Sequence, residues 1–129
     1  MNIYLDIDGV LMANDQRVAN YAHEFVEHLV NKYPVYWLTT HCHGDSSYTI
    51  NHLKQFFNSE TIKLMEKIKP TNWDILKTDA VDFSEPFIWF EDDLFDGEKE
   101  ILKQNNKFDS WVEINFSKDI NQLSKYLEI

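Results

Sequence analysis

The sequence predicts an α/β fold in which helices cover both faces of a mostly parallel sheet. Short apolar runs suited to buried strands alternate along the chain with segments of helical periodicity. Strands that alternate with helices give a parallel sheet inside a Rossmann-like three-layer sandwich. Three of the apolar runs end in polar residues, and the carboxyl ends of parallel strands meet at the edge of a sheet where ligands bind.

The expected strands are residues 2–5, 35–38, 87–90 and 111–114. The expected helices are residues 17–33, a segment after the polar loop 41–47 with Leu53, Phe56 and Phe57 facing inward, and residues 73–81, 98–104 and 119–127. The first helix has apolar side chains at i, i+3, i+4 and i+7 and ends at Pro34. Residues 59–69 fit either structure: Ile62, Met65 and Ile68 suit a helix, whereas Ile62, Leu64 and Ile68 partly suit a strand.

Length and composition indicate one soluble, folded domain over residues 1–129. Hydrophobic residues make up 43% of the chain and aromatic residues 15%, which is enough for a packed core. The formal net charge of −10 disfavours nucleic acid as a partner without excluding it. The single cysteine, Cys42, fits a reducing compartment, and no membrane span or signal peptide is apparent. We therefore expect a cytoplasmic protein.

Asp6 and Asp8 form the strongest chemical motif, because they flank one residue at the end of the first expected strand and Gly9 follows. Carboxylates and carbonyl oxygens are the ligands that Mg²⁺ prefers. Two carboxylates at this spacing can share Mg²⁺ while Asp6 attacks phosphorus to form an aspartyl-phosphate. Asp8 would protonate the leaving oxygen and later deprotonate the attacking water. The alternative is a strand-ending Asx turn without chemistry.

Asp6, Asp8 and Val10 resemble the Asp-x-Asp-x-Thr/Val motif that begins the phosphatases of the haloacid-dehalogenase-like (HAD) hydrolase superfamily. The run that ends in Leu38-Thr39 resembles the second motif of that family. The resemblance implies that the Thr39 hydroxyl and the backbone N–H of Thr40 bind phosphate, with Gly9 also at the phosphate site.

The third motif of the family is a lysine that neutralises the nucleophile and the phosphate. Lys77 occupies its place before the acidic strand, and Lys69 is the rival because Lys-Pro is also common there. The fourth motif matches residues 87–93. By that likeness Asp92 binds the metal directly and Glu91 directly or through water, while Asp93 and Asp96 are solvated or cap a helix.

The resemblance implies a Mg²⁺-dependent phosphatase that hydrolyses a phosphate monoester. The intervals between the motifs leave no room for a substantial cap domain, so we expect an open site. The expected partner is a phosphorylated substrate, and phosphorylated macromolecules are among the candidates. The alternatives are a catalytically idle HAD-like binding module and a receiver-like signalling domain. A receiver needs its phosphorylated Asp on the third strand, whereas the Asp pair here ends the first.

The sequence His41-Cys42-His43 invites a zinc interpretation. Two histidines one residue apart need further ligands, and no second cysteine exists. A substrate-contacting loop or a solvated loop is favoured over zinc. A nucleophilic role for Cys42 is disfavoured because adjacent residues give no oriented Cys–His pair.

Overall fold

Four parallel strands form the sheet of the computed structural model, which describes residues Met1–Ile129. The strands lie in the order β2-β1-β3-β4, so β1 and β3 are the central pair. Leu5 of β1 pairs with Trp37 of β2 on one side and with Phe90 of β3 on the other. Their bounds are β1 Asn2–Leu5, β2 Val35–Trp37, β3 Phe87–Glu91 and β4 Trp111–Glu113. The predicted α/β class with a parallel sheet is confirmed.

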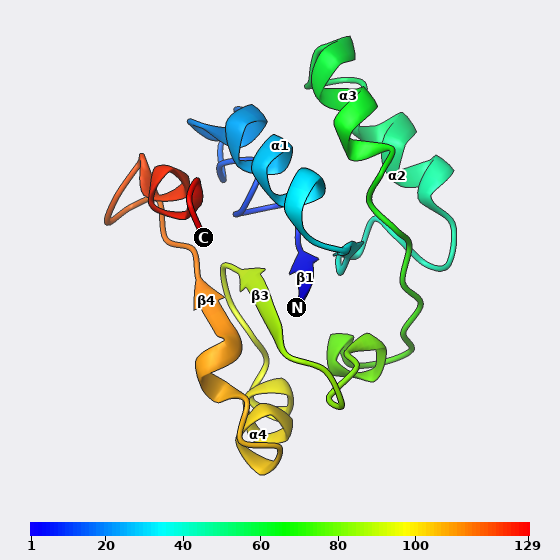
Figure 1. Ribbon diagram of the computed structural model, residues 1–129, viewed down its shortest axis with the longest axis vertical. Helices are drawn as coiled ribbons and strands as arrows, with labels where there is room; N and C mark the ends of the chain where they lie inside the picture. Colours follow the sequence, from blue (N-terminus) through cyan, green and yellow to red (C-terminus); the bar gives the residue numbers. More distant parts are fainter.

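Helices cover both faces of this sheet, as Figure 1 shows. On one face α1 packs against α3 and the 3₁₀ turn η3, and α2 packs against α3. On the other face α4 packs against the 3₁₀ turns η1 and η2. Their bounds are α1 Ala22–Lys32, α2 Ser46–Leu53, α3 Ser59–Met65, η1 Lys77–Ala80, α4 Asp96–Gln104, η2 Phe108–Ser110 and η3 Gln122–Tyr126. The three layers are compatible with a Rossmann-like sandwich.

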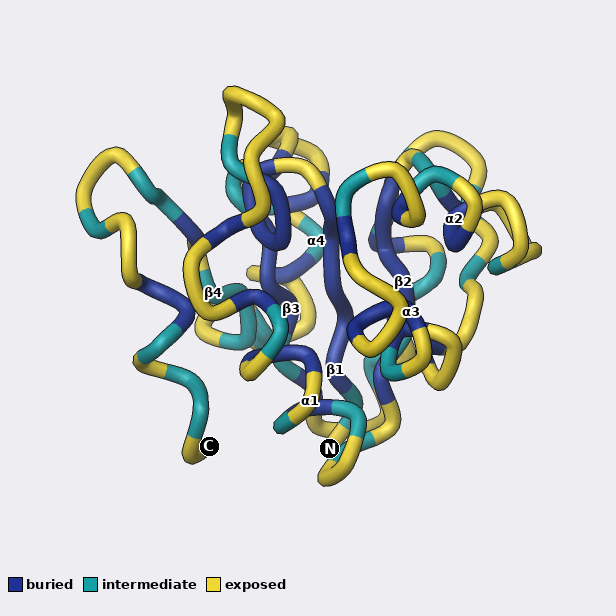
Figure 2. Tube along the Cα trace, turned by 90° about the horizontal axis from the view of Figure 1, so that it is seen from above, coloured by how far each residue is buried: buried dark blue, intermediate teal, exposed yellow.

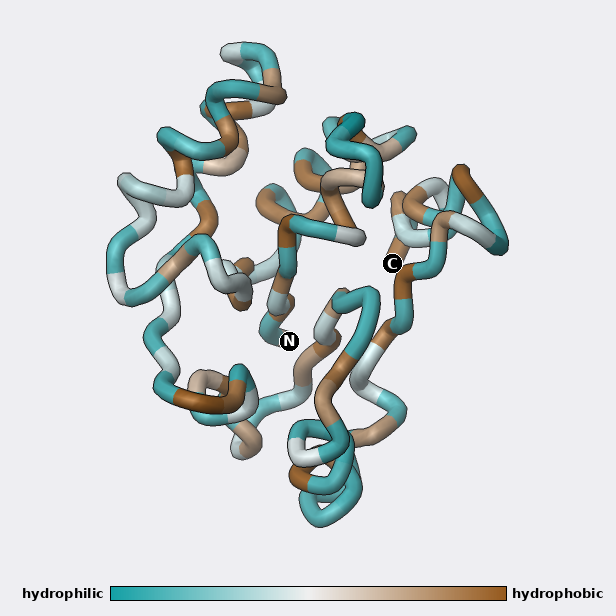
Figure 3. Tube along the Cα trace, turned by 180° about the vertical axis from the view of Figure 1, so that it is seen from behind, coloured by the Kyte–Doolittle hydropathy of each residue, from teal (hydrophilic) through white to brown (hydrophobic).

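Alternation along the strands divides the core into two clusters. Ile3 and Leu5 belong to the larger cluster beneath α1, whereas Tyr4 belongs to the smaller cluster beneath α4. The strands are therefore apolar on both faces, which is typical of parallel sheets. Figure 2 shows this central layer as the buried part of the chain, and Figure 3 shows its hydrophobic segments enclosed by hydrophilic turns. None of the helices has the length and apolar character of a membrane-spanning segment.

The first helix is shorter than predicted, because residues 17–21 are not helical. Tyr21 has a positive φ of 67°, which α-helical residues do not adopt. Before it, the Ile7 carbonyl accepts hydrogen bonds from the N–H groups of Leu11 and Met12. The chain then turns back through residues 12–18. This connection holds the segment after β1 close to the sheet.

Two other predicted helices are wrong. Residues 73–81 contain only η1, because Thr71 is tied to neighbouring segments by its hydroxyl, which donates to the Trp37 carbonyl, and its carbonyl, which accepts from Gly44. Residues 119–127 contain only η3, where the Gln122 side chain bonds to the backbone of Asn115 and Glu113.

The ambiguous segment 59–69 is helical over α3, and its helical-face residues are buried. After the helix, Lys69 forms a single parallel bridge beside Tyr36 of β2. A full further strand is therefore not formed at that edge of the sheet.

Candidate functional site

The carboxyl ends of β1 and β3 lie side by side at the point where the strand order reverses. From β1 the chain goes to β2 on one side, and it then returns to β3 on the other side of β1. Asp6 follows β1 directly, Glu91 is the last residue of β3, and Asp92 comes next. Ligands of open α/β sheets bind at such switch points. The fold thus brings three acidic residues to the position that favours ligand binding.

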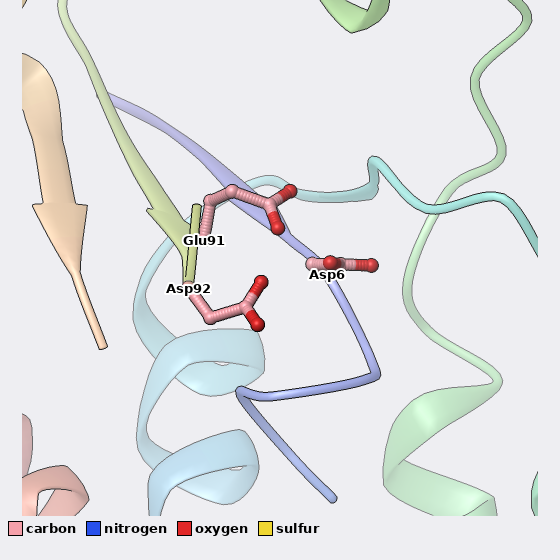
Figure 4. Close-up of side chains that lie close together, drawn as sticks. All are labelled: Asp6, Glu91 and Asp92. Atoms are coloured by element: carbon pink, nitrogen blue, oxygen red, sulfur yellow. The ribbon is translucent and has the colours of Figure 1, made fainter. Parts of the chain in front are cut away.

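The carboxylates of these three residues converge, as Figure 4 shows. One oxygen from each of Asp6, Glu91 and Asp92 lies within 4.8 Å of the others. Asp6 and Glu91 are buried, with 6% and 3% of their surface exposed. The N–H of Ile7 donates to Asp6 Oδ1 at 2.8 Å and orients that carboxylate. A set of convergent carboxylate oxygens fits a hard divalent cation such as Mg²⁺.

Lys77 is the cation that the fold places against this cluster. Its Nζ lies 2.8 Å from Glu91 Oε2 and 3.4 Å from Asp6 Oδ2, and only 14% of its side chain is exposed. Lys69, the rival from the sequence, is exposed and lies above the ring of Tyr36. The structure therefore brings Lys77, and not Lys69, to the acidic residues.

The charges of the cluster do not balance, because three carboxylates face one ammonium group. Burial raises the pKa of Glu91 well above its usual range, and the charge of Asp6 raises it further. Burial alone would lower the pKa of Lys77, but the carboxylates of Asp6 and Glu91 outweigh burial and raise it. A carboxyl group that keeps its proton for lack of nearby positive charge releases that proton to solvent when a cation binds in its place. The electrostatics therefore also favour a divalent ion.

Gly9 allows the chain to pass close to Asp92. A side-chain carbon added to Gly9 would lie 2.5 Å from Cγ and 2.7 Å from Cβ of Asp92, and the φ of Gly9 is +81°. Both facts exclude other residues without strain. The Gly9 N–H donates to the carbonyl of Met12 at 2.7 Å, so it is engaged within the loop. In this structure Gly9 leaves the space that Asp92 occupies, and its place at a phosphate site stays a prediction.

Asp8 lies apart from the acidic cluster, and 69% of its side chain is exposed. Its Oδ2 lies 2.8 Å from Nε2 of His41. The His41 ring stacks on the His52 ring with 4.1 Å between centroids, and the backbone N–H of His41 donates to the Thr39 hydroxyl at 3.3 Å. Through His41, the loop after β2 contacts the loop after β1. Asp8 therefore lies at the rim beside His41, and its side chain is not part of the acidic cluster.

Thr39 and Thr40 follow β2, the other neighbour of β1. Thr39 is fully buried, whereas Thr40 is exposed. Thr40 lines a cavity of about 240 Å³ together with Lys77 and Glu91. Both predicted phosphate-binding threonines thus lie on the loop after β2, and Thr40 lines the same cavity as Lys77, the lysine of the acidic cluster.

The side chains of His41, Cys42 and His43 point in different directions. Cys42 is buried, and its Sγ lies 3.7 Å from the carbonyl oxygen of Thr71. The ring of His43 lies 5.1 Å from that of Trp73, while His41 contacts Asp8. The three side chains form no common metal site.

Glu98 is a site residue that the sequence interpretation missed. It is 3% exposed, its Oε2 accepts the backbone N–H of Lys77 at 2.9 Å, and its Oε1 accepts the N–H of Phe95 at 3.0 Å. It therefore links the start of α4 to the turn that carries Lys77. A glutamate in the first turn of a predicted helix was the available signal. The neighbouring acids Asp93 and Asp96 are exposed, as expected.

Comparison with known proteins gave no match: no family model, no curated protein and no solved structure matches this chain.

Proposed function

We propose that this protein is a Mg²⁺-dependent phosphatase that hydrolyses a phosphate monoester through an aspartyl-phosphate on Asp6. The observation that carries the proposal is the buried cluster of Asp6, Glu91 and Asp92 against Lys77 at the switch point of the sheet. Three carboxylates and one lysine make a centre that binds a cation and, through it, a phosphate dianion. Mg²⁺, when bound, supplies the positive charge that a phosphoryl group needs to approach a carboxylate.

In the first step Asp6 attacks phosphorus, an Asp–O–P bond forms, and the bond from phosphorus to the leaving oxygen breaks. Lys77, 3.4 Å from Asp6 Oδ2, offsets the charge of the nucleophile and of the phosphoryl oxygens. Asp8 at the rim gives its proton to the leaving oxygen. In the second step Asp8 takes a proton from water, water oxygen bonds to phosphorus, and the Asp–O–P bond breaks to release phosphate.

The order of the motifs supports membership of the HAD-like hydrolases, which is part of the proposal. The positions of α1, α2 and α3 support an open site, because these helices pack together on one face of the sheet. α1 lies in the first of the two intervals in which a cap domain would be inserted, between Gly9 and Thr39, and α2 and α3 lie in the second, between Thr40 and Lys77. A phosphorylated protein is a better substrate than a polynucleotide for a chain with a net charge of −10.

The test is hydrolysis of an aryl phosphate by the purified chain with Mg²⁺ and with EDTA. We expect turnover with Mg²⁺, none with EDTA, and none for Asp6→Asn, because the amide is similar in shape but is a poor nucleophile. Acid-quenched labelling with ³²P-substrate should place the label on Asp6. Full activity in EDTA, or label in Asp6→Asn protein, would contradict the proposal.

One observation favours a second candidate, a receiver-like phosphoacceptor domain. The strand order β2-β1-β3-β4 is that of flavodoxin-like receivers as far as it extends, and the third strand is followed by Asp92. In that case Asp92 would accept the phosphoryl group and Asp6 would hold the cation. Against this candidate, Lys77 contacts Asp6 and Glu91, and not Asp92, the residue that would accept the phosphoryl group. The same labelling experiment separates the two, because a stable label on Asp92 without turnover would indicate the receiver.

A further inference from the structure

The cavity beside Lys77 has an apolar wall that the proposed phosphoryl transfer does not use. Its volume is about 240 Å³, and Trp73, Ile75, Leu94 and Phe95 form its apolar part. Ile75 and Phe95 are 77% and 71% exposed, which makes them two of the most exposed large hydrophobic side chains of the chain. The wall comes from two segments, residues 73–75 before η1 and residues 94–95 before α4, and η1 and α4 pack against each other.

The polar residues of the same cavity belong to the candidate reaction centre. Lys77 and Glu91 line it on one side, and Thr40 does so from the loop after β2. A group attached to a phosphoryl bound at Lys77 can therefore extend into the cavity, because Lys77 is part of the cavity wall. An apolar surface that adjoins a few polar groups is the usual composition of a small-molecule site.

We propose that this cavity binds an aromatic ring attached through oxygen to the phosphoryl group, so that the substrates are phenolic phosphate monoesters such as a phosphorylated tyrosine side chain. The inference rests on the proposed phosphatase function. An apolar cavity of about 150 Å³ is large enough for benzene. The cavity here, about 240 Å³, therefore holds one ring and its ester oxygen but is smaller than the roughly 300–1,000 Å³ of sites for larger ligands.

The charge around the cavity selects against longer polyanionic substrates. Asp93 and Glu98 also line it, and Asp93 is exposed at its rim. A second phosphate near Asp93 would be repelled, whereas a ring on an uncharged or basic polypeptide would not. A single phosphate on a phenol therefore fits the cavity better than a phosphate within a nucleic acid chain.

The experiment compares two non-hydrolysable ligands, benzylphosphonate and methylphosphonate, because phosphonates report binding without leaving-group chemistry. Calorimetry with the Mg²⁺-loaded protein gives both dissociation constants. Burial of a ring should make benzylphosphonate bind about tenfold more tightly or better. In the double variant Ile75→Ala/Phe95→Ala the preference should fall to about threefold or less, because both removed side chains contact the ring. Both are exposed, so the variant is expected to fold, and circular dichroism checks it.

The matched control is Ile120→Ala, since Ile120 is also exposed (57%) but lies before η3, away from the cavity. It should keep the preference of the unchanged protein. Equal binding of the two phosphonates by a protein that hydrolyses phosphate monoesters would overturn this inference alone. Failure to bind either phosphonate, together with no hydrolysis, would overturn the proposed function as well. Tighter binding of a nucleoside monophosphate than of benzylphosphonate would also overturn the inference, in favour of a nucleotide.

Discussion

Replacing Lys77 by Met removes the one cation of the acidic cluster and keeps most of the side-chain volume. Lys77 Nζ lies 2.8 Å from Glu91 and 3.4 Å from Asp6. At an effective dielectric constant of about 20, the pair with the Asp6 carboxylate corresponds to about 5 kcal/mol of attraction before desolvation is subtracted. Removal of one partner of a buried pair costs about 3–5 kcal/mol net, and Lys77 is sufficiently buried for that range to apply. We expect Lys77→Met to lower the free energy of unfolding by about 3 kcal/mol.

Urea unfolding in EDTA measures this loss, and initial rates with an aryl phosphate and Mg²⁺ measure activity. The rate should fall by about 10²-fold or more, because the lysine faces both the nucleophile and the developing charge on phosphate. Lys69→Met is the control: Lys69 is exposed and its Nζ lies above the ring of Tyr36, away from the acidic cluster, so a change within about 0.5 kcal/mol is expected. Equal and small effects of the two substitutions on rate and stability would refute the placement of Lys77 in the site.

Three further predictions follow from the same geometry. Mg²⁺ at one hundred times its dissociation constant should stabilise the protein by about 2.7 kcal/mol, and at one fixed Mg²⁺ concentration thermal melts should show a larger shift at pH 8 than at pH 6. Because the pKa of Glu91 is raised, the folded, metal-free chain holds a proton that the unfolded chain releases above the ordinary pKa of 4.5. The stability of the metal-free protein therefore falls as pH rises through the neutral range. A shift in melting temperature that is independent of pH would contradict this. Gly9→Ala should cost about 2 kcal/mol more than Gly44→Ala in urea unfolding, because both glycines have a positive φ but only at Gly9 does the added carbon overlap Asp92; equal costs would show that the overlap is relieved. His41→Ala should slow the hydrolysis of alkyl phosphates about tenfold and that of aryl phosphates less. His41 positions the Asp8 carboxyl group that protonates the leaving oxygen, and a poor leaving group depends more on that proton. His41→Asn should restore part of the rate, and an equal loss for both ester types would contradict the role.

The strands were predictable because their signal is local. Each is a short, largely apolar run, three of these runs end in polar residues, and β1 has the bounds that the sequence predicts. The order of strands and helices along the chain also determines which strand ends meet, so the meeting of Asp6 with Glu91 and Asp92 followed from topology. Lys77 was found by its position before the acidic strand, although the turn that carries it is not the helix expected there.

The remaining site residues were not predictable because their contacts join segments that are distant in sequence. His41 meets Asp8 across 33 residues, and Glu98 meets the backbone of Lys77 across 21. Nothing in the local pattern of residues 73–75 shows that these residues are not helical or that Trp73 and Ile75 line a cavity. The turn at residues 70–72 predicted a helix after it, but the hydrogen bonds of Thr71 to other segments set a different path.

The excess of negative charge distinguishes this cluster from an ion pair that serves stability alone. A structural pair needs one carboxylate for one lysine, whereas Lys77 here faces both Asp6 and Glu91, and Asp92 adds a third carboxylate. Burial of Asp6 and Glu91 without matching positive charge is unfavourable in the isolated chain. Gly9 lies at the same place and lets the chain pass close to Asp92, which a residue with a side-chain carbon would not allow without strain. Because the unbalanced burial of charge occurs at the switch point of the sheet, where ligands of such folds bind, it favours our proposal that a bound cation offsets the charge over a role in folding alone.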